Sequence, residues 1–161
     1  MLHITPVNSK QSVSQAQILF REYGSMPEIG VCVVDFDQEI LSLPGVYALP
    51  TGRLLLAYEE CENCEEAAGC VALRQWEQAT KTCELKRLYV RIPFRRHGVG
   101  RKLIEAAIQE ARSIGYRKIV LDTLPSMSEA HKLYKSAGFH EIPAYQKNLI
   151  PGALFFALKL S

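Results

Sequence analysis

The segment from residue 82 to residue 122 constrains the fold more than any other part of the chain. Thr82–Arg91 has the pattern of a strand, Gly98–Ser113 carries apolar residues on one helical face, and Lys118–Asp122 is a short apolar run. A strand, a helix and a second buried strand in this order are typical of a right-handed parallel crossover. At least part of the sheet is therefore expected to be parallel.

Further strands and helices surround this crossover in the sequence. The predicted strands are His3–Val7, Arg53–Tyr58, Ala67–Gln75, Phe139–Ile142 and Leu154–Leu160. The predicted helices run from a cap at Asn8 or Ser9 to about Tyr23, over Asp37–Leu43 and over Ser126–Ser136. Glu59–Glu66 is expected to form an acidic loop. This order predicts a mixed α/β sheet within one domain that spans residues 1–161.

Composition and charge exclude several classes of protein. The formal net charge of +2 is too small to indicate a nucleic-acid partner. The chain has no run of about 18 apolar residues, and its start lacks a basic region followed by an apolar run. Neither a membrane partner nor a signal peptide is therefore expected. These features indicate a cytoplasmic protein, and they leave a homodimer open.

The cysteines are expected to be structural and reduced. Two residues separate Cys61 from Cys64, but no second pair follows at zinc-finger spacing and glutamates surround them. Negative neighbours raise the pKa of a thiol and disfavour a reactive thiolate. The pair is expected to lie in a solvated loop without a metal, whereas Cys32, Cys70 and Cys83 are expected to be small buried residues.

The strongest local signal is the stretch Arg91–Arg101, which lies between the strand and the helix of the crossover. Gly98 and Gly100 allow a sharp turn and a close approach of a ligand to the backbone. The N–H groups at the start of the helix favour an anion, and the neighbouring arginines can pair with phosphate oxygens. Taken alone, the stretch is equally compatible with a solvated basic loop. It is neither a Walker loop nor a dinucleotide fingerprint, because GKS/T and a third glycine are missing.

Three motifs occur together in one order between residues 84 and 140. Glu84–Val90 forms the preceding strand, Arg95–Gly100 has the form Arg-x-x-Gly-x-Gly, and Leu133–Phe139 places leucine-tyrosine before glycine-phenylalanine. In this order and spacing they resemble the GNAT superfamily of N-acetyltransferases. The resemblance implies a central, mostly antiparallel sheet with a parallel crossover pair and flanking helices. It also implies acetyl-CoA as the acyl donor, with no metal.

The resemblance further implies which residues hold the coenzyme. Backbone groups of Leu88, Tyr89 and Val90 would bind the pantetheine arm and the thioester carbonyl, as one strand pairs with another. The phosphates would lie on Arg95, Arg96, His97, Gly98, Val99, Gly100 and Arg101. One departure concerns the start of the later helix, where many members carry an asparagine and this chain has Ser-Met-Ser at residues 126–128.

Two side chains are candidates for proton transfer. An amine acceptor has an unperturbed pKa of about 10.4, so it must lose a proton before it attacks a thioester. Glu84 is the candidate general base, directly or through water, and it shares a face with Lys86, Leu88 and Val90 if no bulge intervenes. A salt-bridged strand glutamate is the alternative. By the resemblance, Tyr134 is the candidate general acid toward the coenzyme thiolate, and a packing aromatic residue is the alternative.

Other side chains are weaker candidates for the active site. Arg21, Tyr23 and Arg74 are candidate acceptor contacts, although Arg21 also suits the last turn of a helix. His131 is a candidate active-site residue, with a helix-face histidine as the favoured alternative.

The leading functional hypothesis is acetyl-CoA-dependent acetylation of a primary amine by direct attack, with a small-molecule acceptor such as an amino acid or a polyamine. A peptide or protein amine is the alternative acceptor. A non-catalytic acyl-CoA-binding or sensing module and a purely structural domain are hypotheses from other classes. Glu84 and Tyr134 favour the enzyme over the sensor. The loop glycines disfavour a purely structural domain, because glycines at the start of a helix cost backbone entropy.

Overall fold

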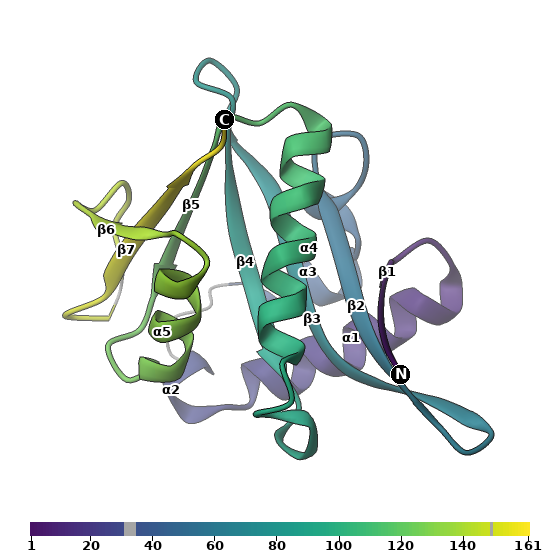
Figure 1. Ribbon diagram of the computed structural model, residues 1–161. Helices are drawn as coiled ribbons and strands as arrows, with labels where there is room; N and C mark the ends of the chain where they lie inside the picture. The colour runs from purple at the N-terminus through teal and green to yellow at the C-terminus, as the bar shows by residue number, and fades with distance from the viewer. Residues whose placement is uncertain (31–34, 149) are drawn as a thin grey trace.

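One mixed sheet connects the parts of the chain that the computed structural model describes, which are residues 1–30, 35–148 and 150–161. Within these ranges, seven strands pair in the order β1-β2-β3-β4-β5-β7-β6 (Figure 1). The strands are β1 Leu2–Pro6, β2 Arg53–Cys61, β3 Cys64–Glu77, β4 Thr82–Val90, β5 Lys118–Thr123, β6 His140–Ile142 and β7 Leu154–Lys159. Among them β4 and β5 are parallel, and the other neighbours are antiparallel. The predicted mixed sheet with a parallel crossover pair is confirmed.

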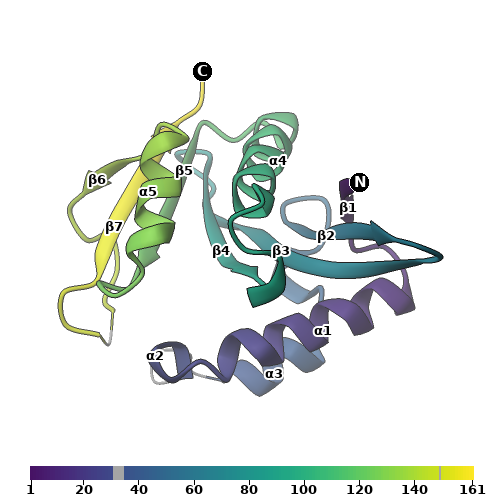
Figure 2. The ribbon, with the colours of Figure 1, turned by 60° about the horizontal axis from the view of Figure 1, so that its bottom comes forward.

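Helices cover both faces of this sheet (Figure 2). They are α1 Lys10–Gly24, α2 Pro27–Gly30, α3 Phe36–Leu41, α4 Val99–Ile114 and α5 Ser128–Ser136, with short 3₁₀ helices at Gly45–Tyr47 and Ile92–Phe94. The helices α1, α2 and α3 lie on one face, and α4 and α5 lie on the other. The predicted cap of α1 is confirmed, because the Ser9 hydroxyl accepts a hydrogen bond from the Ser12 N–H at 3.1 Å. No helix within the described ranges is long and apolar enough to cross a membrane.

Apolar side chains of the central strands fill a core on each face of the sheet. Leu54 and Leu56 of β2 pack toward α1, while Leu55 of the same strand packs toward α4. The α4 side of the core takes Leu103 and Ala107 from the apolar face of that helix. Because helices cover both faces, β2 and β5 have continuous apolar runs instead of a polar-apolar alternation.

The strands β4 and β5 pair over a short stretch and then separate. Their parallel register joins Thr82–Glu84 to Lys118–Val120 and extends no further along either strand. From Leu85 to Val90, the edge of β4 that faces β5 therefore has no strand partner in the described part of the chain. Such an edge leaves backbone N–H and C=O groups available to another extended chain or ligand.

A β-bulge interrupts β4 at the same place. Ala72 of β3 lies opposite Lys86, whereas Cys70 lies opposite Tyr89, so β4 has one residue more than β3 between these two pairs. Arg87, inside the bulge, has a φ of 60°, in the left-handed region. The bulge therefore shifts the alternation of side chains along the rest of β4.

The bulge separates residues that an unbroken strand would place on one face. Leu85 belongs to the core beneath α4, so Glu84 and Lys86 point to the opposite face, toward α1 and α3. Beyond the bulge, Leu88 and Val90 pack against the α4 side of the core. The shared face expected for Glu84, Lys86, Leu88 and Val90 does not occur, because the bulge intervenes.

The predicted acidic loop at residues 59–66 is wrong. The strands β2 and β3 continue through this segment as a hairpin that projects from the sheet, with Cys61 opposite Cys64 (Figure 2). These two cysteines form a disulfide bond instead of the expected free thiols. The glutamates did not prevent strand pairing, because the side chains of a projecting hairpin remain in water.

The remaining cysteines follow the prediction where the structure describes them. Cys70 and Cys83 are buried free thiols, and burial raises the pKa of each to about 12. The expectation for Cys32 falls outside the described residues.

The ion pair between Arg87 of the bulge and Glu39 of α3 is expected to stabilise the fold. Arg87 Nε and Nη2 donate to the two Glu39 carboxylate oxygens at 2.8 Å each, and both side chains are largely buried. Glu39→Gln leaves the buried arginine without its counter-charge. This variant should lower the free energy of unfolding by about 3 kcal/mol, measured by chemical denaturation.

The exposed pair Glu129–Lys132 provides a matched control. Lys132 Nζ lies 3.4 Å from Glu129 Oε1, and both side chains are mostly in water. Glu129→Gln should change the free energy of unfolding by less than about 0.5 kcal/mol. Equal denaturation midpoints for Glu39→Gln and the wild type would show that the Arg87 pair does not stabilise the fold.

Candidate active site

The opening between β4 and β5 holds a cavity of about 550 Å³. Elements far apart in the sequence contribute to its walls, among them Tyr89 of β4, Arg95 of the following loop, Asp122 of β5 and Tyr134 of α5. Of the residues predicted to hold the coenzyme, all except the exposed His97 line this cavity. Tyr134 lines it as well, and Glu84 does not.

The loop before α4 presents an uncapped helix start to the cavity. Gly98 is the N-cap residue, with a φ of 80°, and no side chain caps the helix. The N–H groups of the first helical turn have no acceptor within the helix, so they are available to an anion. Arg95, Arg96 and Arg101 are exposed around this helix start. The arrangement suits a group that carries several phosphate oxygens.

The two glycines of this loop have different structural roles. A Cβ atom at Gly98 would meet no atom within 4 Å beyond its immediate chain neighbours, so its positive φ is the reason for glycine there. A Cβ atom at Gly100 would lie 2.9 Å from Leu133 Cδ1 and 3.8 Å from Val90 Cγ2. Gly100 therefore also permits the close packing of α4 against α5, and a bulky residue there would disturb the fold as well as the anion site.

Polar contacts fix the end of β4. The Tyr89 hydroxyl donates to Glu22 Oε1 at 3.1 Å, and Arg91 Nη2 donates to Glu22 Oε2 at 2.6 Å. The hydrogen bonds from Arg91 lower the pKa of Glu22, so its carboxylate stays charged. Arg95 Nε donates to the Val90 carbonyl at 2.8 Å. These contacts tie α1 and the phosphate loop to the strand edge on which an extended ligand arm would lie.

Tyr134 reaches the cavity from the α5 side. Its ring packs against Phe139 and Phe156, with centroid distances of 5.8 and 6.1 Å. Burial raises the pKa of the Tyr134 phenol, which keeps it protonated at neutral pH. The neighbouring Thr123 Oγ1 is buried, lines the same cavity and has no hydrogen-bond partner among the described residues. A ligand in the cavity would supply that missing partner.

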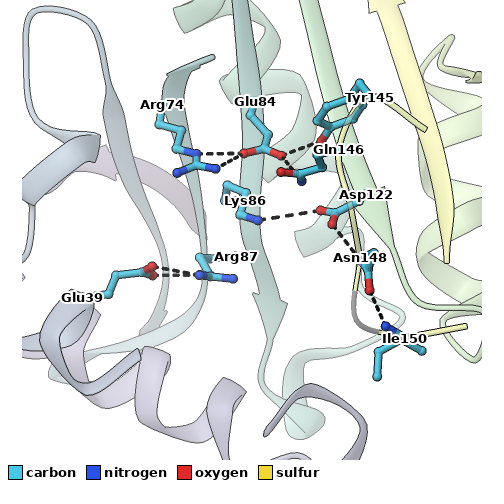
Figure 3. A network of polar contacts seen from close by, with 10 residues as sticks. All are labelled: Glu39, Arg74, Glu84, Lys86, Arg87, Asp122, Tyr145, Gln146, Asn148 and Ile150. Carbon is cyan, nitrogen blue, oxygen red and sulfur yellow. Dashed lines mark hydrogen bonds and ion pairs between the residues drawn. The ribbon is translucent and has the colours of Figure 1, made fainter. Parts of the chain in front are cut away.

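Glu84 does not line the cavity, and its carboxylate belongs to a network of hydrogen bonds (Figure 3). Its side chain is fully buried, and Arg74 donates to Oε1 from Nε at 2.8 Å and from Nη2 at 2.7 Å. The Tyr145 hydroxyl donates to Oε2 at 2.5 Å, and Gln146 Nε2 donates to it at 3.0 Å. Burial, with the Glu84 charge as the next cause, raises the pKa of Tyr145. Glu84 therefore fastens the segment before β7 to β4.

Lys86, Asp122 and Asn148 are cavity residues that were not among the predicted site residues. Lys86 Nζ lies 3.7 Å from Asp122 Oδ1, and Asn148 Nδ2 donates to Asp122 Oδ2 at 2.8 Å (Figure 3). A sequence signal existed for Asp122, because it ends a buried parallel strand, where polar residues often serve a site. The position of Asn148 depends on how a loop returns across the sheet, which no local pattern predicts.

The weaker candidates fall into two groups. Tyr23 lines the cavity, whereas Arg74 pairs with Glu84 and Arg21 is exposed on α1. His131 is buried, with Nε2 at 2.9 Å from the Leu124 carbonyl, in keeping with the structural alternative.

Residues 126–128 are the place where the sequence departs from the asparagine that many members of the resembled family carry. Met127 occupies the N-cap position of α5, and no side chain caps that helix. Ser126 and Ser128 line the cavity instead.

Comparison with known proteins assigns the family. Residues 18–139 match the model of the acetyltransferase (GNAT) family. An uncharacterised N-acetyltransferase of Schizosaccharomyces pombe is 33% identical over 162 residues, which cover 99% of this chain and 96% of that protein. The chain therefore belongs to the GNAT family and is an acetyl-CoA-dependent N-acetyltransferase.

Solved structures show the same fold. An acetyltransferase of the GNAT family from Staphylococcus aureus superposes with a TM-score of 0.79 at 19% identity, with 100% of both chains covered. An acetyltransferase from Salmonella typhimurium, solved with its cofactor acetyl-CoA, superposes with a TM-score of 0.72 at 19% identity, covering 100% of this chain and 95% of that one. At these identities the likeness concerns the fold.

The side chains of this chain fit the coenzyme that the family uses. The uncapped start of α4 and the exposed arginines suit its phosphates, and the unpaired edge of β4 suits its extended amide-bearing arm. The buried Thr123 hydroxyl offers a further polar contact within the same cavity.

Coenzyme A binding should weaken as salt increases, because several cations surround the phosphate site. Arg96→Ala and Arg101→Ala should each reduce the affinity on the order of 10-fold at low salt and flatten its salt dependence. Both arginines are exposed and make no hydrogen bond to the described protein, so these variants should fold normally. Calorimetric titration at several salt concentrations measures both effects.

Arg117→Ala is the matched control, because this exposed arginine lies at the opposite end of α4, between Gly115 and β5. Its affinity and salt dependence should equal those of the wild type. If Arg96→Ala and Arg101→Ala also behave like the wild type, these arginines form a surface patch that does not contact the phosphates.

Proposed function

We propose that the chain transfers the acetyl group of acetyl-CoA to the primary amine of a small molecule by direct attack. One observation carries this proposal. The separation of β4 from β5 brings an uncapped helix start, an unpaired strand edge and a protonated tyrosine into one cavity. Direct attack needs these parts together, because donor, acceptor and proton donor must meet at one carbon atom.

The two faces of the sheet provide separate approaches to this cavity. Tyr134 and Thr123 lie on the face that α4 and α5 cover. Tyr134 belongs to α5, and Thr123 points to the same side of β5 as the core residue Leu121. Lys86 and Asp122 alternate with the core residues Leu85 and Leu121 and so lie on the opposite face, where α1, α2 and the segment before β7 contribute residues to the cavity. An amine that enters from the second face would have the leaving thiolate on the side of Tyr134.

A small acceptor agrees with how this second face is bordered. Tyr145 and Gln146 are bound to Glu84, and Asn148 is bound to Asp122, so the segment before β7 is held against the opening. The cavity of about 550 Å³ must also take the acyl end of the coenzyme. The space that remains suits a small molecule better than a folded protein surface.

The reaction requires three proton transfers. The ammonium group first loses a proton, and the neutral nitrogen attacks the thioester carbon and forms the C–N bond. The nitrogen then loses its second proton as the C–S bond breaks with its electron pair on sulfur, and the sulfur takes up a proton. Acetyl-CoA supplies the thioester that is split. We propose that the Tyr134 hydroxyl gives the proton that the thiolate takes. We propose that Asp122, a carboxylate that lines the cavity, receives the first proton from the ammonium group.

The role we propose for Glu84 is indirect. Its carboxylate is fully buried and already accepts hydrogen bonds from Arg74, Tyr145 and Gln146. A group in this state cannot touch an amine in the cavity without breaking its own network. Glu84 would therefore promote the reaction through the segment it holds, or accept a proton only through a relay that starts at Tyr145.

The basic test of the proposed function is an acceptor screen. The protein is mixed with acetyl-CoA and a panel of amino acids, polyamines and peptides, and the release of free thiol is measured. Thiol release with a small primary amine supports the proposal. Coenzyme A binding without thiol release for any amine would indicate a binding or sensing module instead.

Tyr134→Phe should lower turnover by roughly 10- to 10³-fold while coenzyme A affinity stays close to that of the wild type, because one oxygen is removed and the ring remains. The loss should shrink with an acyl donor whose thiol has a much lower pKa, because that leaving group needs less protonation. Steady-state kinetics with both donors measure the effect. An equal loss with both donors, with chemistry rate-limiting, contradicts proton donation by Tyr134.

Tyr116→Phe is the matched control for this variant. Tyr116 is buried away from the cavity, and its hydroxyl donates to the Thr51 carbonyl at 2.6 Å. Removing this hydroxyl should cost about 1 kcal/mol of stability and leave turnover unchanged.

Glu84→Gln separates positioning from base catalysis. If Glu84 acts by holding the segment before β7, the rate should fall by roughly 10²-fold, and the acid limb of the pH–rate profile should keep its position. Tyr145→Phe should show a smaller loss of rate with the same pH profile, because it loosens the same segment and keeps the carboxylate. Disappearance of the acid limb in Glu84→Gln would instead identify Glu84 as the proton acceptor.

A further inference from the structure

The pair of Lys86 and Asp122 has an unusual geometry for charges on a cavity wall. Lys86 Nζ lies 3.7 Å from Asp122 Oδ1, which is beyond hydrogen-bond distance, although both side chains are only 15% exposed. Among the residues that the structure describes, Lys86 Nζ has no other ion-pair partner and no hydrogen bond. The Lys86 side chain lines the cavity, and its ammonium group is not among the fully buried polar atoms without a partner, so it is accessible to a ligand there.

The other two ion pairs drawn in Figure 3 are within hydrogen-bond distance, unlike the Lys86 pair. Arg74 binds Glu84 through two nitrogens at 2.8 and 2.7 Å, and Arg87 binds Glu39 through two nitrogens at 2.8 Å each. Each of these carboxylates has its arginine as a two-pronged partner, which suits a structural role. The Lys86 pair uses a single flexible ammonium group, so it can open to admit a ligand without disturbing the fold.

Asp122 is fixed by a hydrogen bond from Asn148, whereas Lys86 has no hydrogen bond among the described residues. Asn148 Nδ2 donates to Asp122 Oδ2 at 2.8 Å, and the Ile150 N–H donates to Asn148 Oδ1 at 2.8 Å. The Oδ1 atom, which faces Lys86, is the oxygen left for another donor. A fixed carboxylate and a movable ammonium group thus stand side by side on the acceptor face of the cavity.

We propose that Lys86 and Asp122 bind the acceptor as a zwitterion, which makes the acceptor an α-amino acid. Lys86 binds the carboxylate of the amino acid, and Asp122 binds its ammonium group. The inference rests on the proposed function and narrows its acceptor class. Inserting a zwitterion replaces one loose ion pair by two hydrogen-bonded ones and leaves the net charge of the wall unchanged.

Charge balance argues against other small amines. A simple amine would compete with Lys86 for Asp122 and bring no carboxylate of its own, so the Lys86 ammonium group would lose its ion-pair partner. A polyamine would bring further positive charges next to the same lysine. A molecule with its carboxylate and ammonium group on one carbon atom meets both wall charges at once, because the two wall groups are themselves close together.

The test compares each of several α-amino acids with the matched amine that lacks only the carboxylate. Thiol release from acetyl-CoA gives kcat/KM for the wild type, Lys86→Met and Lys86→Arg. The wild type should prefer the amino acid by about 10- to 100-fold. Lys86→Met should lose this preference by lowering kcat/KM for the amino acid, whereas kcat/KM for the amine should rise, because the amine no longer competes with Lys86 for Asp122. Lys86→Arg keeps the charge and should keep most of the preference.

Two controls keep the test decisive. Lys118→Met removes an exposed lysine at the other end of β5 and should leave the preference unchanged. Coenzyme A affinity, measured by calorimetry, should be the same for Lys86→Met and the wild type, which shows that the coenzyme site remains folded.

Several outcomes would overturn the inference while the proposed function stands. One is equal or better acetylation of the matched amine, or of a linear polyamine, by the wild type. Another is an equal loss for both substrates in Lys86→Met, which means that Lys86 does not read the carboxylate. Binding of coenzyme A without thiol release for any amine would overturn the proposed function and the inference with it.

Discussion

Backbone pairing between β4 and β5 ends after Glu84 and Val120, and the rest of the site depends on this early ending. A continued parallel ladder would satisfy the edge of β4 with the edge of β5 and leave no room between them. Because the ladder ends, β4 keeps free backbone groups for an extended ligand arm, and α5 can place Tyr134 over the opening. The bulge at Arg87 lies at the same level of β4 and is held by Glu39. The strand separation opens the cavity, and the bulge places Lys86 on one face of the sheet and Leu88 and Val90 on the other.

Much of the fold was predictable, because its signals are local. The apolar face of α4 repeats with helical period, and a glycine follows the helix at residue 115, so α4 was predicted to within one residue at each end. The parallel crossover followed from the order of strand, helix and strand, without any contact information. The uncapped start of α4 among exposed arginines was predictable, because two glycines and several cations lie within a short stretch of the sequence.

What the sequence could not predict depends on register or on long-range contacts. The bulge in β4 could not be predicted from the sequence, because it is defined only by which residues of β3 lie opposite those of β4. The hairpin at residues 59–66 resembled a loop, because glutamates are poor strand formers where a side chain must be buried. Glu84 had the sequence pattern of a catalytic base, but its partners Tyr145 and Gln146 come from a segment about 60 residues away.

The charges of the acceptor face differ in how tightly they are bound, and this difference separates structure from recognition. Guanidinium groups that share two hydrogen bonds with one carboxylate are costly to open, so Arg74 and Arg87 are suited to hold β4, α3 and the segment before β7 in place. An ammonium group has no fixed plane, and the Lys86 ammonium stands too far from Asp122 for a hydrogen bond. Within these rigid surroundings, the loose Lys86–Asp122 pair would let the proposed acceptor site respond to a charged ligand without a change in the proposed coenzyme site. Because the proposed phosphate site lies at the start of α4, on the other face of the sheet, we expect residues such as Lys86 to change the acceptor preference without loss of the acyl donor.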